Sequence, residues 1–154
     1  MAKQFTINLD KPNYAIIRKD RAEQKGGGVC FILKDSLDFE QLLAPDNIEA
    51  LIFKVKNYIN SSRDMVVATY YNPPQATLDT QFIKELFNQH ENVLLLGDLN
   101  CRSPLWKNYN SNGKKLEELL LANKLPKNVN TRLKKQTGKC SKKAQLNYYQ
   151  PSTA

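Results

Sequence analysis

Five short segments of the chain combine Val, Ile, Leu, Phe and Tyr between glycine, proline or polar residues, which is the pattern of β-strands. They run from Tyr14 to Arg18, Val29 to Leu33, Glu49 to Val55, Met65 to Tyr71 and Val93 to Leu96. The pattern therefore predicts five strands, which is enough for a sheet.

Two segments in the later half place apolar residues at helical spacing. The first runs from about Thr77 to Asn88, with Thr77 or Asp79 available as its cap, and Asn72-Pro73-Pro74 ends the strand before it. The second runs from about Gly113 to Asn123 and is rich in Leu, Lys and Glu, which favour helix. We expect both helices to cover the sheet.

The run from Val93 to Asn100 joins four apolar residues to a glycine, a carboxylate and an amide. A strand without polar alternation is usually covered on both faces, and side chains two positions apart in extended backbone point to the same side. The run therefore predicts that Asp98 and Asn100 project together from the mouth of a buried strand. The alternative is ordinary turn chemistry, because Asp and Asn bond their own backbone and Gly tolerates positive φ.

Length and composition are those of one ordinary globular domain, with 154 residues, 41% hydrophobic and 25% charged. No apolar stretch approaches the roughly 20 residues that span a bilayer, and the start of the chain lacks the apolar core of a secretory signal. We therefore expect an intracellular protein. Cys30, Cys101 and Cys140 are odd in number and widely spaced, and His90 is the one histidine, so neither a disulfide framework nor a zinc site is expected.

The net charge of +8 is concentrated at the end of the chain. Of the 23 Lys and Arg residues, 15 lie up to Glu118 and 8 after it, whereas all 15 Asp and Glu residues lie up to Glu118. A basic stretch can follow a phosphate backbone or serve as a nuclear address, and it can also be a solvated terminus. We predict a domain over residues 1–131 and a basic, poorly ordered tail over residues 132–154. The candidate nucleic-acid-binding residues are Arg102, Arg132, Lys134, Lys135, Lys139, Lys142 and Lys143.

Several short motifs follow one another in a distinctive order. They are Tyr14, Arg18-x-Asp20-Arg21, Gly26-Gly27-Gly28-Val29, Ile48-Glu49, Tyr71-Asn72-Pro73-Pro74, Leu96-Gly97-Asp98-Leu99-Asn100, Ser103-x-x-Trp106, Asn112-Gly113 and Asn130-Thr131. Over roughly Tyr14 to Thr131, this order and spacing resembles the endonuclease/exonuclease/phosphatase superfamily, and within it the endonuclease domain of non-LTR retrotransposons.

The resemblance implies an α/β (α+β) fold, here a partial four-layer α/β/β/α sandwich of two sheets flanked by helices. It implies a metal-dependent phosphodiesterase that nicks DNA so that a reverse transcriptase can prime at the cut. In that enzyme Asp98 would activate the attacking water and bind Mg²⁺, Asn100 would orient water and phosphate, and Tyr71 would place its hydroxyl near the scissile group. Mg²⁺ suits this chemistry because it prefers oxygen ligands and offsets the negative charge that grows on the phosphate.

Other motif residues have plainer interpretations. Tyr71 can also be an aromatic residue that fills core at a strand edge. Glu49 is interpreted as structural, Trp106 as a packing anchor and His90 as a solvated loop residue. Gly26-Gly27-Gly28 opens no helix and has no Walker lysine, so a turn is favoured over a phosphate-binding loop.

Two parts of the family pattern have no match in this sequence. The family carries an asparagine and the metal-binding glutamate before the position of Tyr14, where Asn8 and Asp10 are poor substitutes. Its closing Ser-Asp-His is also missing, because no acidic residue follows Glu118. We therefore expect a fragment truncated at both ends, with little or no catalysis and with exposed sheet edges that favour self-association. The parent protein is expected to be fused to a reverse transcriptase.

Three functions compete. The first is a domain descended from a Mg²⁺-dependent DNA endonuclease. The second is a non-catalytic remnant that binds nucleic acid through its basic C-terminal tail. The third is a sugar- or lipid-phosphate phosphatase of the same superfamily, which the Gly-Gly-Gly and Pro-Pro motifs make less favourable.

Overall fold

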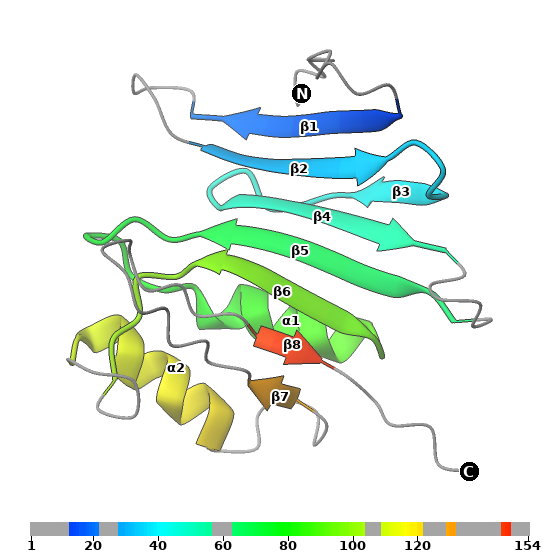
Figure 1. Ribbon diagram of the computed structural model, residues 1–154. Helices are drawn as coiled ribbons and strands as arrows, with labels where there is room; N and C mark the ends of the chain where they lie inside the picture. The colour runs from blue at the N-terminus through cyan, green and yellow to red at the C-terminus, as the bar shows by residue number, and fades with distance from the viewer. Residues whose placement is uncertain are drawn as a thin grey trace, which may run out of the picture. The chain divides into compact units, whose positions relative to one another are not determined.

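Strands and two helices form an α+β fold, as the sequence predicts (Figure 1). The structure is a computed structural model that describes residues 13–21, 28–56, 63–103, 109–121, 129–131 and 146–148. The chain divides into two compact units, Met1–Tyr71 and Asn72–Ala154, and each is described by itself.

The described part of the first unit is made of strands. β1 (Tyr14–Asp20) pairs antiparallel with β2 (Gly28–Lys34), while β3 (Phe39–Leu42), β4 (Glu49–Val55) and β5 (Met65–Tyr71) are antiparallel neighbours in that order. The bounds of β4 and β5 are those predicted, and β1 and β2 run slightly further. The prediction missed β3 because this strand holds only two apolar residues, Phe39 and Leu42, so its pairing with β4 decides its conformation.

The core of this unit forms between the pair β1 and β2 and strand β4. Ile17, Leu33, Leu51 and Phe53 are buried together, with Val29, Phe31 and Phe39 packed against them. Phe53 is fully buried, and its ring centroid lies 5.0 Å from that of Phe31 and 5.6 Å from that of Phe39, both edge to face. This geometry places ring edges against ring faces and adds to the burial of apolar area.

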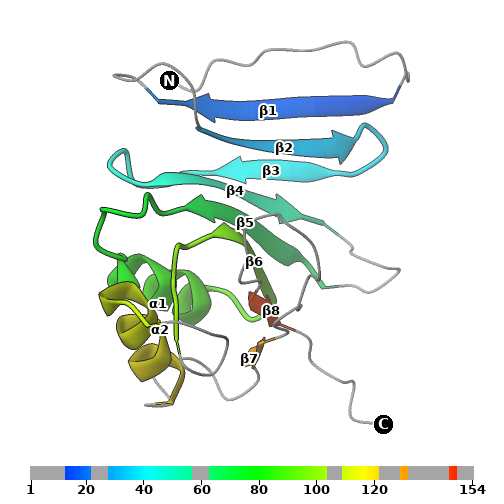
Figure 2. The same cartoon turned by 60° about the vertical axis from the view of Figure 1, so that its left-hand side comes forward.

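The described part of the second unit carries both helices and three strands, which Figure 2 also draws. Its elements are α1 (Thr80–Gln89), β6 (Val93–Asp98), α2 (Ser111–Leu121), β7 (Val129–Thr131) and β8 (Leu146–Tyr148). β8 lies between β6 and β7 and is antiparallel to both. The prediction of a poorly ordered tail omitted β8, while the other residues of 132–154 lie outside the described part, so that prediction stays untested.

Both helices bury apolar residues at helical spacing. The Asp79 carboxylate accepts a 2.9 Å hydrogen bond from the Phe82 N–H, so α1 begins after Asp79 rather than at Thr77. Its buried residues are Phe82, Ile83, Leu86 and Phe87, and α2 buries Leu116 and Leu119. Within the described residues, neither helix is long and apolar enough to cross a membrane.

Replacing Phe53 tests the core of the first unit. Phe53→Ala removes a fully buried ring and both of its ring partners, so the free energy of unfolding should fall by about 3–5 kcal/mol. Leu43→Ala is the control, since Leu43 is 99% exposed and its loss should change stability by less than about 0.5 kcal/mol. Urea unfolding of the two variants measures both values, and equal stability would contradict this description of the core.

Candidate functional site

The end of β6 carries the carboxylate that the sequence singles out. Val93 and Leu95 are buried, each 1% exposed, whereas Leu94 and Leu96 are only partly buried. The predicted covering on both faces is therefore complete on one face and partial on the other. Gly97 has φ +135°, a backbone conformation that L side chains rarely adopt, so this position favours glycine before Asp98.

A turn, rather than extended backbone, brings Asp98 and Asn100 together. β6 ends at Asp98, and Asn100 has φ +49°, in the left-handed region that asparagine tolerates. The Asp98 Oδ1 accepts a 3.0 Å hydrogen bond from the Asn100 N–H. The extended backbone predicted from Asp98 to Asn100 is therefore wrong. The turn chemistry given as its alternative is what the structure shows, and it still leaves Asp98 and Asn100 hydrogen-bonded to each other.

Asn72 holds this turn from the segment that follows β5. The Asn72 N–H donates to the Asp98 carbonyl over 2.9 Å, and the Asn100 Nδ2 donates to the Asn72 carbonyl over 2.8 Å. The Asn72 side chain is buried and donates to the carbonyls of Leu99 and Ala76 over 3.3 and 3.2 Å. The asparagine of the Tyr-Asn-Pro-Pro motif therefore fixes the amide group of Asn100.

Asn110 holds the same turn from the other side. Its Nδ2 donates to the Asn100 carbonyl over 2.7 Å, and its Oδ1 accepts from the N–H groups of Arg102 and Gly113 over 2.9 and 2.7 Å. The Asn110 N–H also donates to the Arg102 carbonyl over 3.0 Å. One side chain thus joins the turn to the start of α2, and no motif in the sequence pointed to Asn110.

The Asn112-Gly113 pair anchors α2 on the segment before α1. Buried Asn112 accepts from the Leu78 N–H over 2.9 Å and donates to the Ala76 carbonyl over 2.7 Å. A Cβ on Gly113 would overlap the backbone of Arg102, so this position requires glycine. The sequence motif therefore marks a close backbone contact beside the turn.

Cys101 and Ser103 continue the segment after the turn. Burial, and secondarily the negative charge of Asp98, raises the pKa of the Cys101 thiol to about 12. The Cys101 Sγ donates to the Leu99 carbonyl over 3.4 Å, and the fully buried Ser103 donates from its Oγ to the Glu117 carboxylate over 3.2 Å. These groups hold the segment and provide no thiolate near neutral pH.

Tyr71 belongs to the first unit and lies at the end of β5. It pairs with Glu49 across β4 and β5, and the Arg21 guanidinium carbon lies 5.1 Å from the centre of its ring. Glu49 accepts a 2.6 Å charged hydrogen bond from the Arg21 Nε. The role predicted for Tyr71 beside Asp98 stays a prediction.

Of the remaining residues singled out in the sequence, the structure describes Arg102 and His90. Arg102 is exposed, and its backbone bonds to Asn110 as given above. His90 is the partly buried C-cap of α1. The residues that lie outside the described part are Trp106, Arg132, Lys134, Lys135, Lys139, Lys142 and Lys143.

Asp98 offers the kind of oxygen donor that Mg²⁺ prefers. Among the described residues, however, no group of three His, Cys, Asp or Glu side chains lies close enough to hold a metal ion. One Asp98 oxygen is also bonded to the Asn100 N–H.

Gly113→Ala should destabilise the chain, against the usual effect of this change. In an ordinary helix alanine is about 1 kcal/mol more favourable than glycine, but here the new methyl group meets the Arg102 backbone. We expect a loss of about 1–3 kcal/mol in the free energy of unfolding. Lys115→Ala, at an exposed position of the same helix, is the control in urea unfolding. A more stable Gly113→Ala variant would rule out the close contact.

Alkylation should distinguish Cys101 from Cys30. With its pKa raised to about 12, the Cys101 thiol stays protonated as pH rises through the neutral range and forms thiolate only in strong alkali. Near about pH 8, exposed Cys30 should therefore react with iodoacetamide about tenfold faster or more in the folded chain. Mass spectrometry of the peptides measures both rates, and in urea they should converge. Equal rates in the folded chain would disprove the burial of Cys101.

Comparison with known proteins gives a family match over the part of the chain that holds the turn at Asp98 and Asn100. The family described as endonuclease-reverse transcriptase matches residues 65–143, just over half of the chain. The match includes Tyr71, Asp98 and Asn100, and it continues beyond the boundary predicted at residue 131. No curated protein and no solved structure matches the chain. The chain belongs to the endonuclease-reverse transcriptase family.

Proposed function

We propose that this chain is a nuclease domain that hydrolyses phosphodiester bonds in DNA, as in target nicking by a retrotransposon. The observation that carries the proposal is the turn at Asp98 and Asn100, which hydrogen bonds from Asn72 and Asn110 hold in place within the family match. A carboxylate and an amide held in fixed geometry can position a nucleophile without reorganising during the reaction.

Asp98 is the proposed general base. Its Oδ1 accepts from the Asn100 N–H, which orients the carboxylate, and the group is partly exposed at the end of β6. The other oxygen, Oδ2, would accept the proton of the attacking water. Asn100 would orient the water or the phosphate, and Tyr71 would place its hydroxyl near the scissile group.

Mg²⁺ is part of the proposal because a phosphodiester carries negative charge that grows in the transition state. Asp98 would be one of the oxygen ligands of Mg²⁺. Its other ligands would have to come from water, from the substrate phosphate or from further residues of the chain, because no group of three His, Cys, Asp or Glu side chains forms among the described residues. We expect weak activity at most, since this sequence has no match to the family's metal-binding glutamate or to its Ser-Asp-His. A nuclear location and a parent protein fused to a reverse transcriptase complete the proposal.

Asp98→Asn tests the base directly. The amide oxygen of asparagine can still accept from the Asn100 N–H, so the turn should persist, whereas the proton acceptor is lost. Nicking of supercoiled plasmid with Mg²⁺ should fall by about 100-fold or more, and EDTA should abolish it in the unaltered chain.

Asp46→Ala is the matched control, because Asp46 is an exposed aspartate of the first unit. It should nick at the rate of the unaltered chain. Equal nicking by the unaltered chain and Asp98→Asn would refute the role of Asp98.

The second candidate function is binding of nucleic acid without cleavage. It is favoured by the distribution of charge, since 8 Lys and Arg residues and no Asp or Glu follow Glu118. Arg102 and the basic residues from Arg132 to Lys143 would then contact phosphates. A chain that binds DNA with strong salt dependence but never nicks would fit this candidate and not the first.

A further inference from the structure

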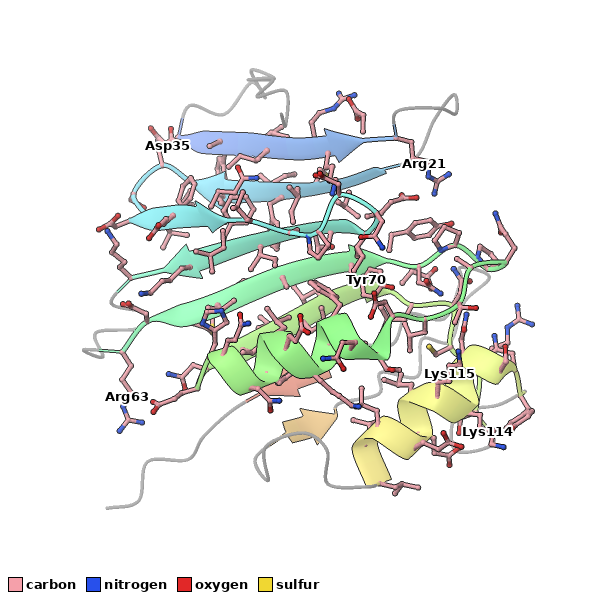
Figure 3. All side chains as sticks on the ribbon, turned by 180° about the vertical axis from the view of Figure 1, so that it is seen from behind. Arg21, Asp35, Arg63, Tyr70, Lys114 and Lys115 are labelled. Atoms are coloured by element: carbon pink, nitrogen blue, oxygen red, sulfur yellow. The ribbon has the colours of Figure 1, made fainter. Side chains whose placement is uncertain are left out.

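Arg21 lies directly after β1 (Figure 3). Its guanidinium contacts one residue of β4 and one of β5. Its Nε donates to the Glu49 Oε1 over 2.6 Å, and its guanidinium carbon lies 5.1 Å from the centre of the Tyr71 ring. Glu49 and Tyr71 are register partners in β4 and β5, so the two anchors stand side by side on one face.

Arg18 in β1 bonds to both oxygens of a carboxylate, and it serves as a comparison for Arg21. Its Nε donates to both carboxylate oxygens of Asp20, over 2.9 and 3.1 Å, and its Nη2 donates to the Asp20 Oδ2 over 2.8 Å. This is the two-pronged contact that arginine usually makes with a carboxylate.

Arg21 makes a different contact with Glu49. Only its Nε bonds to the carboxylate, and the second oxygen, Glu49 Oε2, is buried with no hydrogen-bond partner. The two Nη groups of Arg21 therefore make no hydrogen bond to Glu49. A buried acceptor without a hydrogen-bond partner costs free energy, so this ion pair stabilises the fold less than a two-pronged pair would.

The surroundings keep Arg21 charged and restrict its motion. Hydrogen bonding to Glu49, followed by hydrogen bonding to the Tyr71 side chain, raises the pKa of Arg21. Its side chain is 23% exposed, so the guanidinium is partly removed from water but still reachable. An oriented and partly dehydrated guanidinium suits phosphate oxygens, which it can bind with two parallel N–H groups.

We propose that Arg21 binds a phosphate of the nucleic-acid backbone beside Tyr71, with Glu49 holding its Nε edge and the Nη edge facing the phosphate. The proposal rests on the proposed function for the choice of a phosphodiester as ligand. It assigns a ligand to the Arg-Asp-Arg motif, in which Arg18 is held by Asp20 and Arg21 is presented to the substrate.

The salt dependence of DNA binding tests this assignment. The full-length chain carrying Asp98→Asn is titrated onto a fluorescent DNA duplex in EDTA at several salt concentrations, so that binding is measured without cleavage. Adding Arg21→Gln should weaken binding about five- to tenfold at low salt and reduce the slope of log affinity against log salt by about one.

Arg18→Gln is the matched control, because it removes an equal charge from the same strand but from an arginine already bound to Asp20. It should leave the slope unchanged. Arg21→Lys keeps the charge but lacks the planar fork, so it should keep the slope and bind less tightly than the parent. Thermal unfolding monitored by circular dichroism checks that each variant is folded.

An Arg21→Gln variant that binds like the parent, or like Arg18→Gln, overturns the assignment. If Arg21→Gln does not fold, Arg21→Lys decides, and unchanged affinity in that variant overturns it as well. A parent chain that does not bind DNA also overturns it. Nicking that survives Asp98→Asn refutes the proposed general base alone, since the binding slopes do not depend on cleavage.

Discussion

The backbone at Asn100 turns into the left-handed region, and hydrogen bonds from neighbouring asparagines hold it there. Asn72 accepts from the Asn100 side chain, and Asn110 donates to the Asn100 carbonyl while it also accepts from the start of α2. Asn112 fixes the same helix to the segment before α1. The end of β6, the segment after β5 and the start of α2 are therefore tied to one turn. The orientation of the Asp98 carboxylate follows from that constraint, because its Oδ1 accepts from the turn itself.

In each unit, hydrogen bonds within that unit hold the polar side chains of the candidate site in place. In the second unit the asparagines satisfy backbone groups that an irregular segment leaves without a strand or helix partner. In the first unit the pairing of β4 with β5 places Glu49 opposite Tyr71. The Arg21 side chain donates a hydrogen bond to Glu49, and its guanidinium lies over the Tyr71 ring. Both arrangements hold functional groups through hydrogen bonds at or just after a strand end, and groups oriented in advance need less reorganisation when a charged ligand arrives.

The sequence led to the correct neighbours at the site by an argument that was partly mistaken. Strand alternation predicted Asp98 and Asn100 on one side, but β6 ends at Asp98 and a turn joins the two residues. Glycine, aspartate and asparagine are the residues that such turns require, so the composition of the motif carried the information even though the assumed backbone was wrong. The bond from the Gly113 N–H to Asn110 is local capping chemistry, but the bonds of Asn110 to the backbone of Asn100 and Arg102, ten and eight residues earlier, depend on the tertiary structure. Glu49 was interpreted as purely structural, and only the structure shows its unpartnered buried oxygen.

Local pattern by itself determined the bounds of β4 and β5, narrowed the cap of α1 to Thr77 or Asp79, and gave the resemblance to a nuclease family that the match over residues 65–143 supports. These features depend on residues close in sequence, whose periodicity and capping chemistry are visible without coordinates. Tertiary structure decided the strand β3, the unequal burial of the two faces of β6 and the close contact that requires Gly113. Each of these features depends on which distant segment of the chain packs against the residue in question. Long-range pairing and packing decide this, and the order of residues within one segment does not reveal it.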